Sequence, residues 1–163
     1  MTAAAYSELA DQLRAFGESV RGARQRAHLS KSAVARAVGI DRSAITRIER
    51  GVQAPKFSTL LRLARTLDST PAELLAAIGP AEPMPLSNDG VAPDRPAKRF
   101  GENLRLARAG AGVSQADLAL DAPTDWSLLS GYETGKRAPN LRSILKLAHS
   151  LGVSPAALLC DVR

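Results

Sequence analysis

Residues 29–51 read LSKSAVARAVGIDRSAITRIERG and decide the fold. Two short stretches of helical apolar spacing are joined there by the interruption Val38-Gly39-Ile40. Ser30 is a good N-cap for the first helix and Asp41 for the second. Gly51 is expected to end the second helix, because a glycine just beyond a helix adopts the left-handed conformation at little cost. Two helices joined by a tight turn that contains glycine form a helix-turn-helix.

The pattern around this stretch occurs twice, in residues 16–76 and 100–160, at a constant offset of 84 without a gap. The identical pairs include Phe16/Phe100, Gly17/Gly101, Glu18/Glu102, Arg24/Arg108, Ser30/Ser114, Glu49/Glu133, Gly51/Gly135, Pro55/Pro139 and Pro71/Pro155. Chance similarity would not preserve the glycines and prolines that punctuate helices, so the chain carries two copies of one small fold.

Each copy is predicted to have five helices. Besides the central pair, the first copy shows helical spacing over about 8–26 and 58–67, and a capping box at Thr70-Pro71-Ala72-Glu73. In the second copy the first helix is expected to shorten to about 100–109. No segment alternates as a strand does. The sequence therefore predicts an all-α protein with two tandem five-helix domains, 1–78 and 99–163.

The residues between the copies, 79–98, hold five of the ten prolines and few large apolar residues. This composition predicts an extended, proline-rich linker. Leu9 and Leu13 extend the apolar stripe of the first helix beyond the part that the copies share. That surface can either cap the first core or form a dimer contact.

The central pair, with Pro55 after it, closely resembles the XRE family of lambda-repressor and Cro-like DNA-binding domains. The matching positions are the small residue Ala35, Gly39, the aliphatic residues Val34, Ile45 and Ile48, and the ending Glu-x-Gly-x-x-x-Pro. The resemblance covers both copies. It implies two lambda-repressor-like domains, with the second helix of the pair in the major groove of double-stranded DNA.

Carried over to this sequence, the family pattern implies that Arg42, Ser43 and Arg47 lie at base edges. Arginine pairs with guanine through two hydrogen bonds, which is the commonest specific contact. The candidates for phosphate contacts are Lys31, Thr46, Arg50, Gln53 and Lys56.

Charge is unequal between the copies. The chain has a formal net charge of +6 and a sequence pI near 10.1. Residues 16–76 contain 11 Lys/Arg against 5 Asp/Glu, a balance of +6, whereas residues 100–160 contain 6 against 5, a balance of +1. The first copy is therefore the one expected to contact an anionic partner.

The second copy departs from the family pattern at three positions: Pro123 replaces Gly39, Trp126 replaces Arg42, and Gly131 replaces Arg47. The residues that can still contact DNA or a partner are Gln115, Trp126, Ser127, Lys136 and Arg137. Trp126 has three open roles: packing in the core, facing DNA, or forming a protein interface. The second copy thus either reads a different, weaker half-site or serves as an interaction module.

Other classes of function find little support in the residues. The single cysteine, Cys160, is interpreted as a small buried residue, and the two histidines as ordinary surface residues. No catalytic residue, metal ligand or cofactor is expected. No apolar run is long enough for a membrane, so we expect a cytoplasmic protein that is nucleoid-associated when bound to DNA.

The sequence therefore favours a sequence-specific DNA-binding transcriptional regulator, with repression preferred, rather than an enzyme. The alternative is an antitoxin or adaptor whose second domain mediates dimerisation or binds a protein. The expected partners are double-stranded DNA, a second copy of the chain, and a protein held by the second domain.

Overall fold

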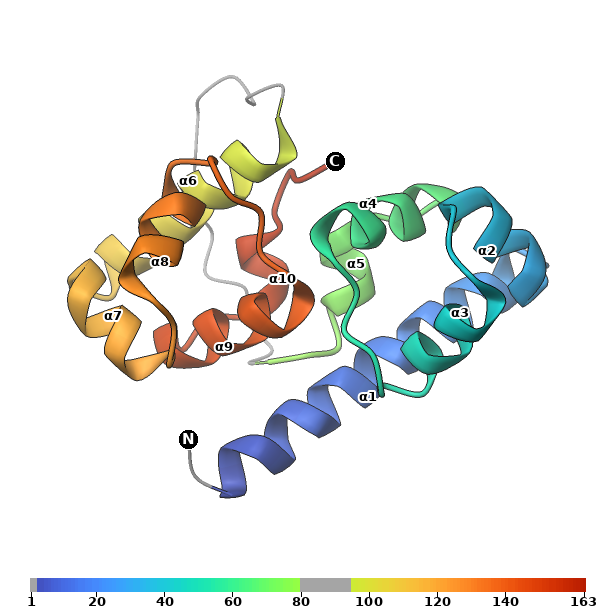
Figure 1. The fold of residues 1–163 in the computed structure, drawn as a ribbon, viewed down its shortest axis with the longest axis horizontal. Helices are drawn as coiled ribbons and strands as arrows, with labels where there is room; N and C mark the ends of the chain where they lie inside the picture. Colours follow the sequence, from blue (N-terminus) through green and yellow to red (C-terminus); the bar gives the residue numbers. More distant parts are fainter. Residues whose placement is uncertain (1–2, 80–94) are drawn as a thin grey trace.

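The structure, a computed structural model, describes residues 3–79 and 95–163. These residues form helices and no named strand (Figure 1). The first repeat contains α1 (Ala3–Arg26), α2 (Lys31–Val38), α3 (Arg42–Glu49), α4 (Phe57–Thr66) and α5 (Pro71–Leu75). The second contains α6 (Pro96–Gly110), α7 (Gln115–Asp121), α8 (Trp126–Glu133), α9 (Leu141–Leu151) and α10 (Pro155–Leu158). The prediction of an all-α, tandem fold is confirmed.

Local signals set most helix ends of the first repeat. The Ser30 hydroxyl accepts a hydrogen bond from the Ala33 N–H at 3.1 Å, as an N-cap should. Gly39 ends α2 in the left-handed conformation, with φ 70°. Thr70 and Glu73 form the predicted capping box around the first turn of α5. Asp41 has the extended backbone of an N-cap, but its side chain makes no capping hydrogen bond, so that part of the prediction is wrong.

The second repeat differs at its first two helices. α7 ends one residue earlier than its counterpart α2, because Pro123 has a fixed negative φ and cannot form the left-handed cap that Gly39 provides. α6 begins at Pro96 rather than near Phe100, with the proline in the first turn, where its missing N–H costs nothing. The last residues of the predicted linker, 96–98, therefore belong to α6. Residues 80–94 of the linker lie outside the described part of the chain.

A single apolar core runs through both repeats. Ile45 and Leu60 from the first repeat and Phe100 and Leu129 from the second are all fully buried members of one cluster. The helical spacing predicted over about 58–67 is confirmed, because Leu60, Leu63 and Ala64 of α4 are buried, as is Leu67 directly after it. The expectation for Cys160 is wrong: it follows the last turn of α10 and is exposed, as is its counterpart Ala76.

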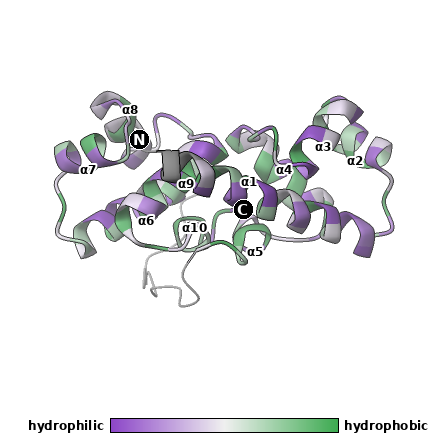
Figure 2. Cartoon of the chain, turned by 90° about the horizontal axis from the view of Figure 1, so that it is seen from below, coloured by the Kyte–Doolittle hydropathy of each residue, from purple (hydrophilic) through white to green (hydrophobic). Residues whose placement is uncertain are grey.

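The two repeats pack against each other. α5 contacts α10, and α1 contacts α9. The backbone of Lys56 forms an antiparallel bridge with that of Asn140, and the Leu141 N–H donates to the Pro55 carbonyl oxygen at 3.1 Å. Seen from below, α2 and α3 lie at one end of the molecule and α7 and α8 at the other, while α5 and α10 lie near the middle (Figure 2).

None of the described helices combines the length and apolar character needed to cross a lipid bilayer.

Candidate nucleic-acid interface

The exposed side of α3 carries the residues predicted to read bases. Ala44, Ile45 and Ile48 are buried in the core, whereas Arg42, Ser43 and Arg47 are exposed. Burial of one side of this short helix therefore directs the other side outward. The three predicted residues share that outward side, where a DNA groove can reach them.

Arg47 is held in place by a neighbour. Its Nε donates to Gln53 Oε1 at 2.8 Å, which leaves the two terminal nitrogens of the guanidinium free for a base. Gln53 was predicted to contact a phosphate. The structure pairs it with Arg47, at the loop that follows α3, and its contact with a phosphate stays a prediction.

A buried ion pair anchors the far end of α3. Arg24 on α1 donates from Nε to Glu49 Oε1 at 2.6 Å and from Nη1 to the Leu29 carbonyl oxygen at 2.9 Å. The Glu49 side chain is only 3% exposed. One guanidinium thus connects α1, the segment before α2, and the last residue of α3.

Lys31 joins this group, because its Nζ lies 3.3 Å from Glu49 Oε2. The predicted phosphate ligand therefore shares the buried carboxylate with Arg24 and keeps a partly exposed ammonium. Of the other predicted phosphate ligands, Arg50 and Lys56 are exposed, and the Thr46 hydroxyl donates to the Arg42 carbonyl oxygen at 3.2 Å.

The second repeat contains the same buried ion pair, but it has no lysine at the position of Lys31. Arg108 pairs with Glu133 at 2.6 Å, and this hydrogen bond raises the pKa of the Arg108 guanidinium. Gln115, the counterpart of Lys31, donates from Nε2 to Glu133 Oε2 at 2.6 Å. Gln115 was predicted to contact DNA or a partner, which stays a prediction, and the structure places its amide on this carboxylate.

The outward side of α8 differs most from that of α3. Trp126 is 57% exposed, so its packing in the core is ruled out. A methyl group added at Gly131 would lie 3.0 Å from Arg137 Cδ, which shows that the Arg137 side chain covers this glycine. Lys136 and Arg137 are both exposed beyond the end of α8.

The start of α8 is also occupied by a carboxylate. The Ser127 N–H donates to Asp125 Oδ1 at 2.7 Å. Hydrogen bonds from the Ser127 side chain and then its backbone lower the pKa of the Asp125 carboxyl, which keeps it charged. The equivalent position of the first repeat also holds an aspartate, Asp41, but its side chain makes no capping hydrogen bond, so the N–H groups at the start of α3 are not occupied by a carboxylate.

Comparison with known proteins agrees with these observations. Residues 20–74 match a family model described as helix-turn-helix, and residues 99–159 match one described as a helix-turn-helix domain. The restriction-modification controller protein C.AhdI from Aeromonas hydrophila is 40% identical over 38% of this chain and 94% of its own, with a TM-score of 0.37. The chain belongs to the XRE-type helix-turn-helix family. No curated protein matches it at a significant level.

Membership of the XRE-type family makes the chain a DNA-binding transcriptional regulator.

The residues that anchor α3 and α8 were missed at the sequence level, although a signal existed. Arg24/Arg108 and Glu49/Glu133 are opposite charges kept in both copies of an XRE-type repeat, while the charged residues Arg26, Arg47 and Arg50 near them are not kept in the second copy. His149, interpreted as an ordinary surface residue, lies with Nδ1 3.1 Å from Glu8 Oε1 across the two repeats.

Proposed function

We propose that the chain is a repressor whose first repeat reads one DNA half-site with α3. The observation that carries this proposal is the outward side of α3, where Arg42, Ser43 and Arg47 lie together on a helix fixed from behind by Arg24 and Glu49. Two arginines held this way can each pair with a guanine in the major groove.

The surrounding cations hold the phosphate backbone in this proposal. Arg50 and Lys56 are exposed, and Lys31 retains a partly free ammonium beside Glu49. Such contacts fix the register of the helix in the groove and supply affinity without regard to sequence. Thr46 and Gln53 take lesser parts: Thr46 borders the phosphates, and Gln53 orients Arg47.

The test of base reading uses a site selected from random duplexes and two double variants. We expect Arg42→Ala/Arg47→Ala to lose about 1 to 3 kcal/mol per arginine on the selected site and to relax the preference at two base pairs. The matched control is Arg26→Ala/Arg65→Ala, which removes the same charge from two hollows beside α5. The control should weaken specific and non-specific binding alike. Equal effects of the two variants on base preference would refute the assignment of α3.

Repression follows from occupancy. A bound regulator that overlaps a promoter excludes the polymerase, and no further domain is needed for that effect. A reporter gene with the selected site placed across its promoter should lose expression when the protein is present, and Arg42→Ala/Arg47→Ala should restore it. A rise in expression with the wild-type protein would contradict the repressor assignment. In this proposal the protein is cytoplasmic, is nucleoid-associated when bound, and is not an enzyme.

One observation favours a second candidate, in which the second repeat binds a protein as an antitoxin or adaptor does. Trp126 and Leu120 are large apolar side chains that are 57% and 81% exposed in the second repeat. Tryptophan is enriched at the centres of protein interfaces. Trp126→Ala would then lower the sedimentation coefficient of the assembly with such a protein and leave base preference unchanged. An unchanged sedimentation profile would remove this candidate.

A further inference from the structure

The two repeats are related by an approximate twofold axis, which follows from the residues that meet. Lys56 and Asn140 occupy equivalent positions, since they are 84 residues apart, and their backbones pair directly. α5 and α10 are likewise equivalent elements in contact. An element that packs against its own counterpart lies on the twofold axis that relates the two copies.

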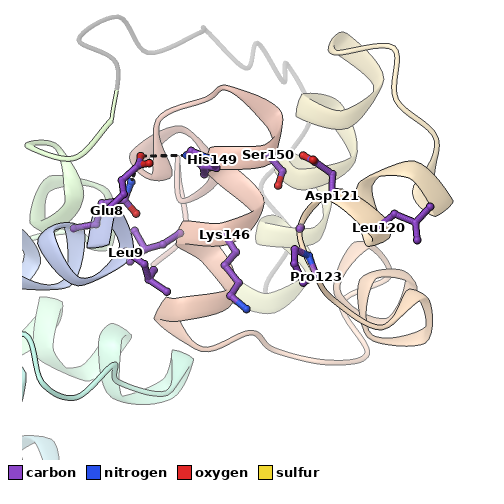
Figure 3. Close-up of a pocket in the computed structure, with 11 residues that line it drawn as sticks. Glu8, Leu9, Leu120, Asp121, Pro123, Lys146, His149 and Ser150 are labelled. Carbon is purple, nitrogen blue, oxygen red and sulfur yellow. Dashed lines mark hydrogen bonds and ion pairs between the residues drawn. The ribbon is translucent and has the colours of Figure 1, made fainter. Parts of the chain in front are cut away.

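A second pair of equivalent elements meets on each side of this axis, through different residues. Phe57 of α4 meets Phe100 of α6 edge-on, with ring centroids 5.9 Å apart. On the other side, α9 meets α1, and Glu8 Oε1 lies 3.1 Å from His149 Nδ1 (Figure 3). Because α4 corresponds to α9 and α6 to α1, the same pair of elements touches in both places. The arrangement is that of an isologous dimer formed inside one chain.

An isologous interface is closed, because each copy uses the same patch on the other. Here that patch is already occupied, and Leu9, whose apolar surface was a candidate dimer contact, is 6% exposed beside the α1 and α9 junction. α3 and α8 lie on the same, upper side of the molecule in Figure 2, at opposite ends. One chain thus presents two helix-turn-helix units as a twofold dimer presents them to DNA.

The two units are not equal in chemistry. Arg42 and Arg47 of α3 correspond to Trp126 and Gly131 of α8. The guanidinium near Gly131 comes instead from Arg137, which lies after the helix and covers the glycine. The second unit therefore keeps exposed cations but lacks both arginines with which the first is proposed to read bases.

We infer that one chain binds an asymmetric DNA site as a monomer. The first repeat reads its half of the site through α3, and the second repeat sits on the adjacent half and holds phosphates through Lys136 and Arg137 without selecting bases there. This inference rests on the proposed function for the first half-site only.

The first experiment measures stoichiometry and the selected sequence with the full chain. Sedimentation equilibrium with a selected duplex should give one chain per duplex, and the base preferences should fall within one half. A hydroxyl-radical footprint should nevertheless protect two backbone segments about 10 bp apart, centre to centre. A palindromic site that holds two chains would overturn this inference and leave the proposed function standing. Failure to select any sequence would instead count against the proposed function.

The second experiment separates phosphate contacts from base contacts in the second repeat. We expect Lys136→Ala/Arg137→Ala to lower the slope of log affinity against log salt by about 2 and to leave the selected sequence unchanged. The control Arg65→Ala/Arg163→Ala removes two charges that line one hollow beside α5, and it should change the slope less. An equal slope change in both variants would overturn the phosphate assignment.

The third experiment adds base reading where it is absent. The variant Trp126→Arg/Gly131→Arg/Arg137→Gln rebuilds in the second repeat the set formed by Arg42, Arg47 and Gln53 in the first. The Arg137 change replaces the guanidinium by an amide, while the Cβ and Cγ atoms of residue 137 remain, at 3.3 and 3.1 Å from a methyl group added at position 131, so this side chain has to shift slightly. The selected site should then gain an inverted copy of the first half. A folded variant, checked by circular dichroism, that selects the original asymmetric site would contradict the inference.

Discussion

The pairing of Arg24 with Glu49 shows how one residue can hold a binding surface in place without being part of that surface. Arg24 lies on α1, behind α3, yet its guanidinium holds the last residue of α3 and the segment before α2. The ion pair is largely removed from water, with side chains 13% and 3% exposed. A charge left without its partner in such a place is strongly destabilising.

The prediction at this scale concerns the removal of one partner. Glu49→Ala leaves Arg24 and Lys31 without their shared carboxylate, and we expect a loss of about 3 kcal/mol in the free energy of unfolding. Glu18→Ala, which removes an exposed carboxylate from α1, should change it by less than about 0.5 kcal/mol. Urea unfolding monitored by circular dichroism measures both. Similar losses in the two variants would show that the pair does not anchor α3.

The sequence predicted residue types better than residue partners. It identified Arg42, Ser43 and Arg47 as surface residues of one helix, and the structure exposes all three. It did not predict that Gln53 bonds Arg47 or that Lys31 bonds Glu49. These partners depend on how a loop and two helices cross, which helical spacing within each segment does not specify.

Between elements, the crossing of α1 and α3 depends on a missing side chain. A methyl group at Gly17 would lie 2.6 Å from the Ile48 carbonyl oxygen and 2.7 Å from that of Glu49. Neither atom can move without displacing the backbone of α3. Gly101 approaches α8 in the same way, which explains why both repeats keep glycine here.

Gly17 and Gly22 provide a matched pair of tests within α1. We expect Gly17→Ala to destabilise the protein by about 1 to 3 kcal/mol, because the new methyl group overpacks the crossing. At Gly22 the nearest atom to an added methyl group is the tip of the Arg26 side chain at 3.4 Å, so Gly22→Ala should stabilise the helix by about 0.5 to 1 kcal/mol. Thermal unfolding gives the sign of each change. Two changes of the same sign would contradict this account of the crossing.

Helix ends were predictable where a local pattern sets them. Ser30 and the capping box at Thr70 and Glu73 appear as expected, because each acts within a single turn. The start of α6 was predicted too late. Pro96 and the residues directly after it were assigned to the proline-rich linker. They are helical because the following turns of α6 pack on the second core and the helix extends back from there.

For the whole molecule, the sequence predicted two domains but not their association. The repeat and the prolines between the copies indicated separate units. A linker limits how far apart two domains can lie, but it does not say whether or how they pack together. Leu9 and Leu13 were the one signal, since their apolar surface exceeded what the repeats share, and both prove to be buried. Which surface covers them depends on contacts between residues far apart in the chain.

The shared core leads us to expect that both repeats unfold together. Trp126, the single tryptophan, reports on the second repeat, while circular dichroism reports on all helices. The two signals should give one coincident urea transition. Phe57→Ala, in the first repeat, should shift both to lower urea because it removes the contact with Phe100, whereas Val52→Ala, at an exposed position, should shift neither. A Trp126 transition that does not move with Phe57→Ala would show that the repeats unfold separately.

The direct pairing of Lys56 with Asn140 also has a consequence for how mutations affect the two halves of the molecule. In an assembly of two identical chains, one nucleotide change in the gene alters both halves of the assembly at once. Here the counterparts across the axis are separate codons, as the lysine and the asparagine themselves show. Each half can therefore drift, lose a contact or acquire a new one while the other stays intact, and the regulator can adopt a new target one half at a time.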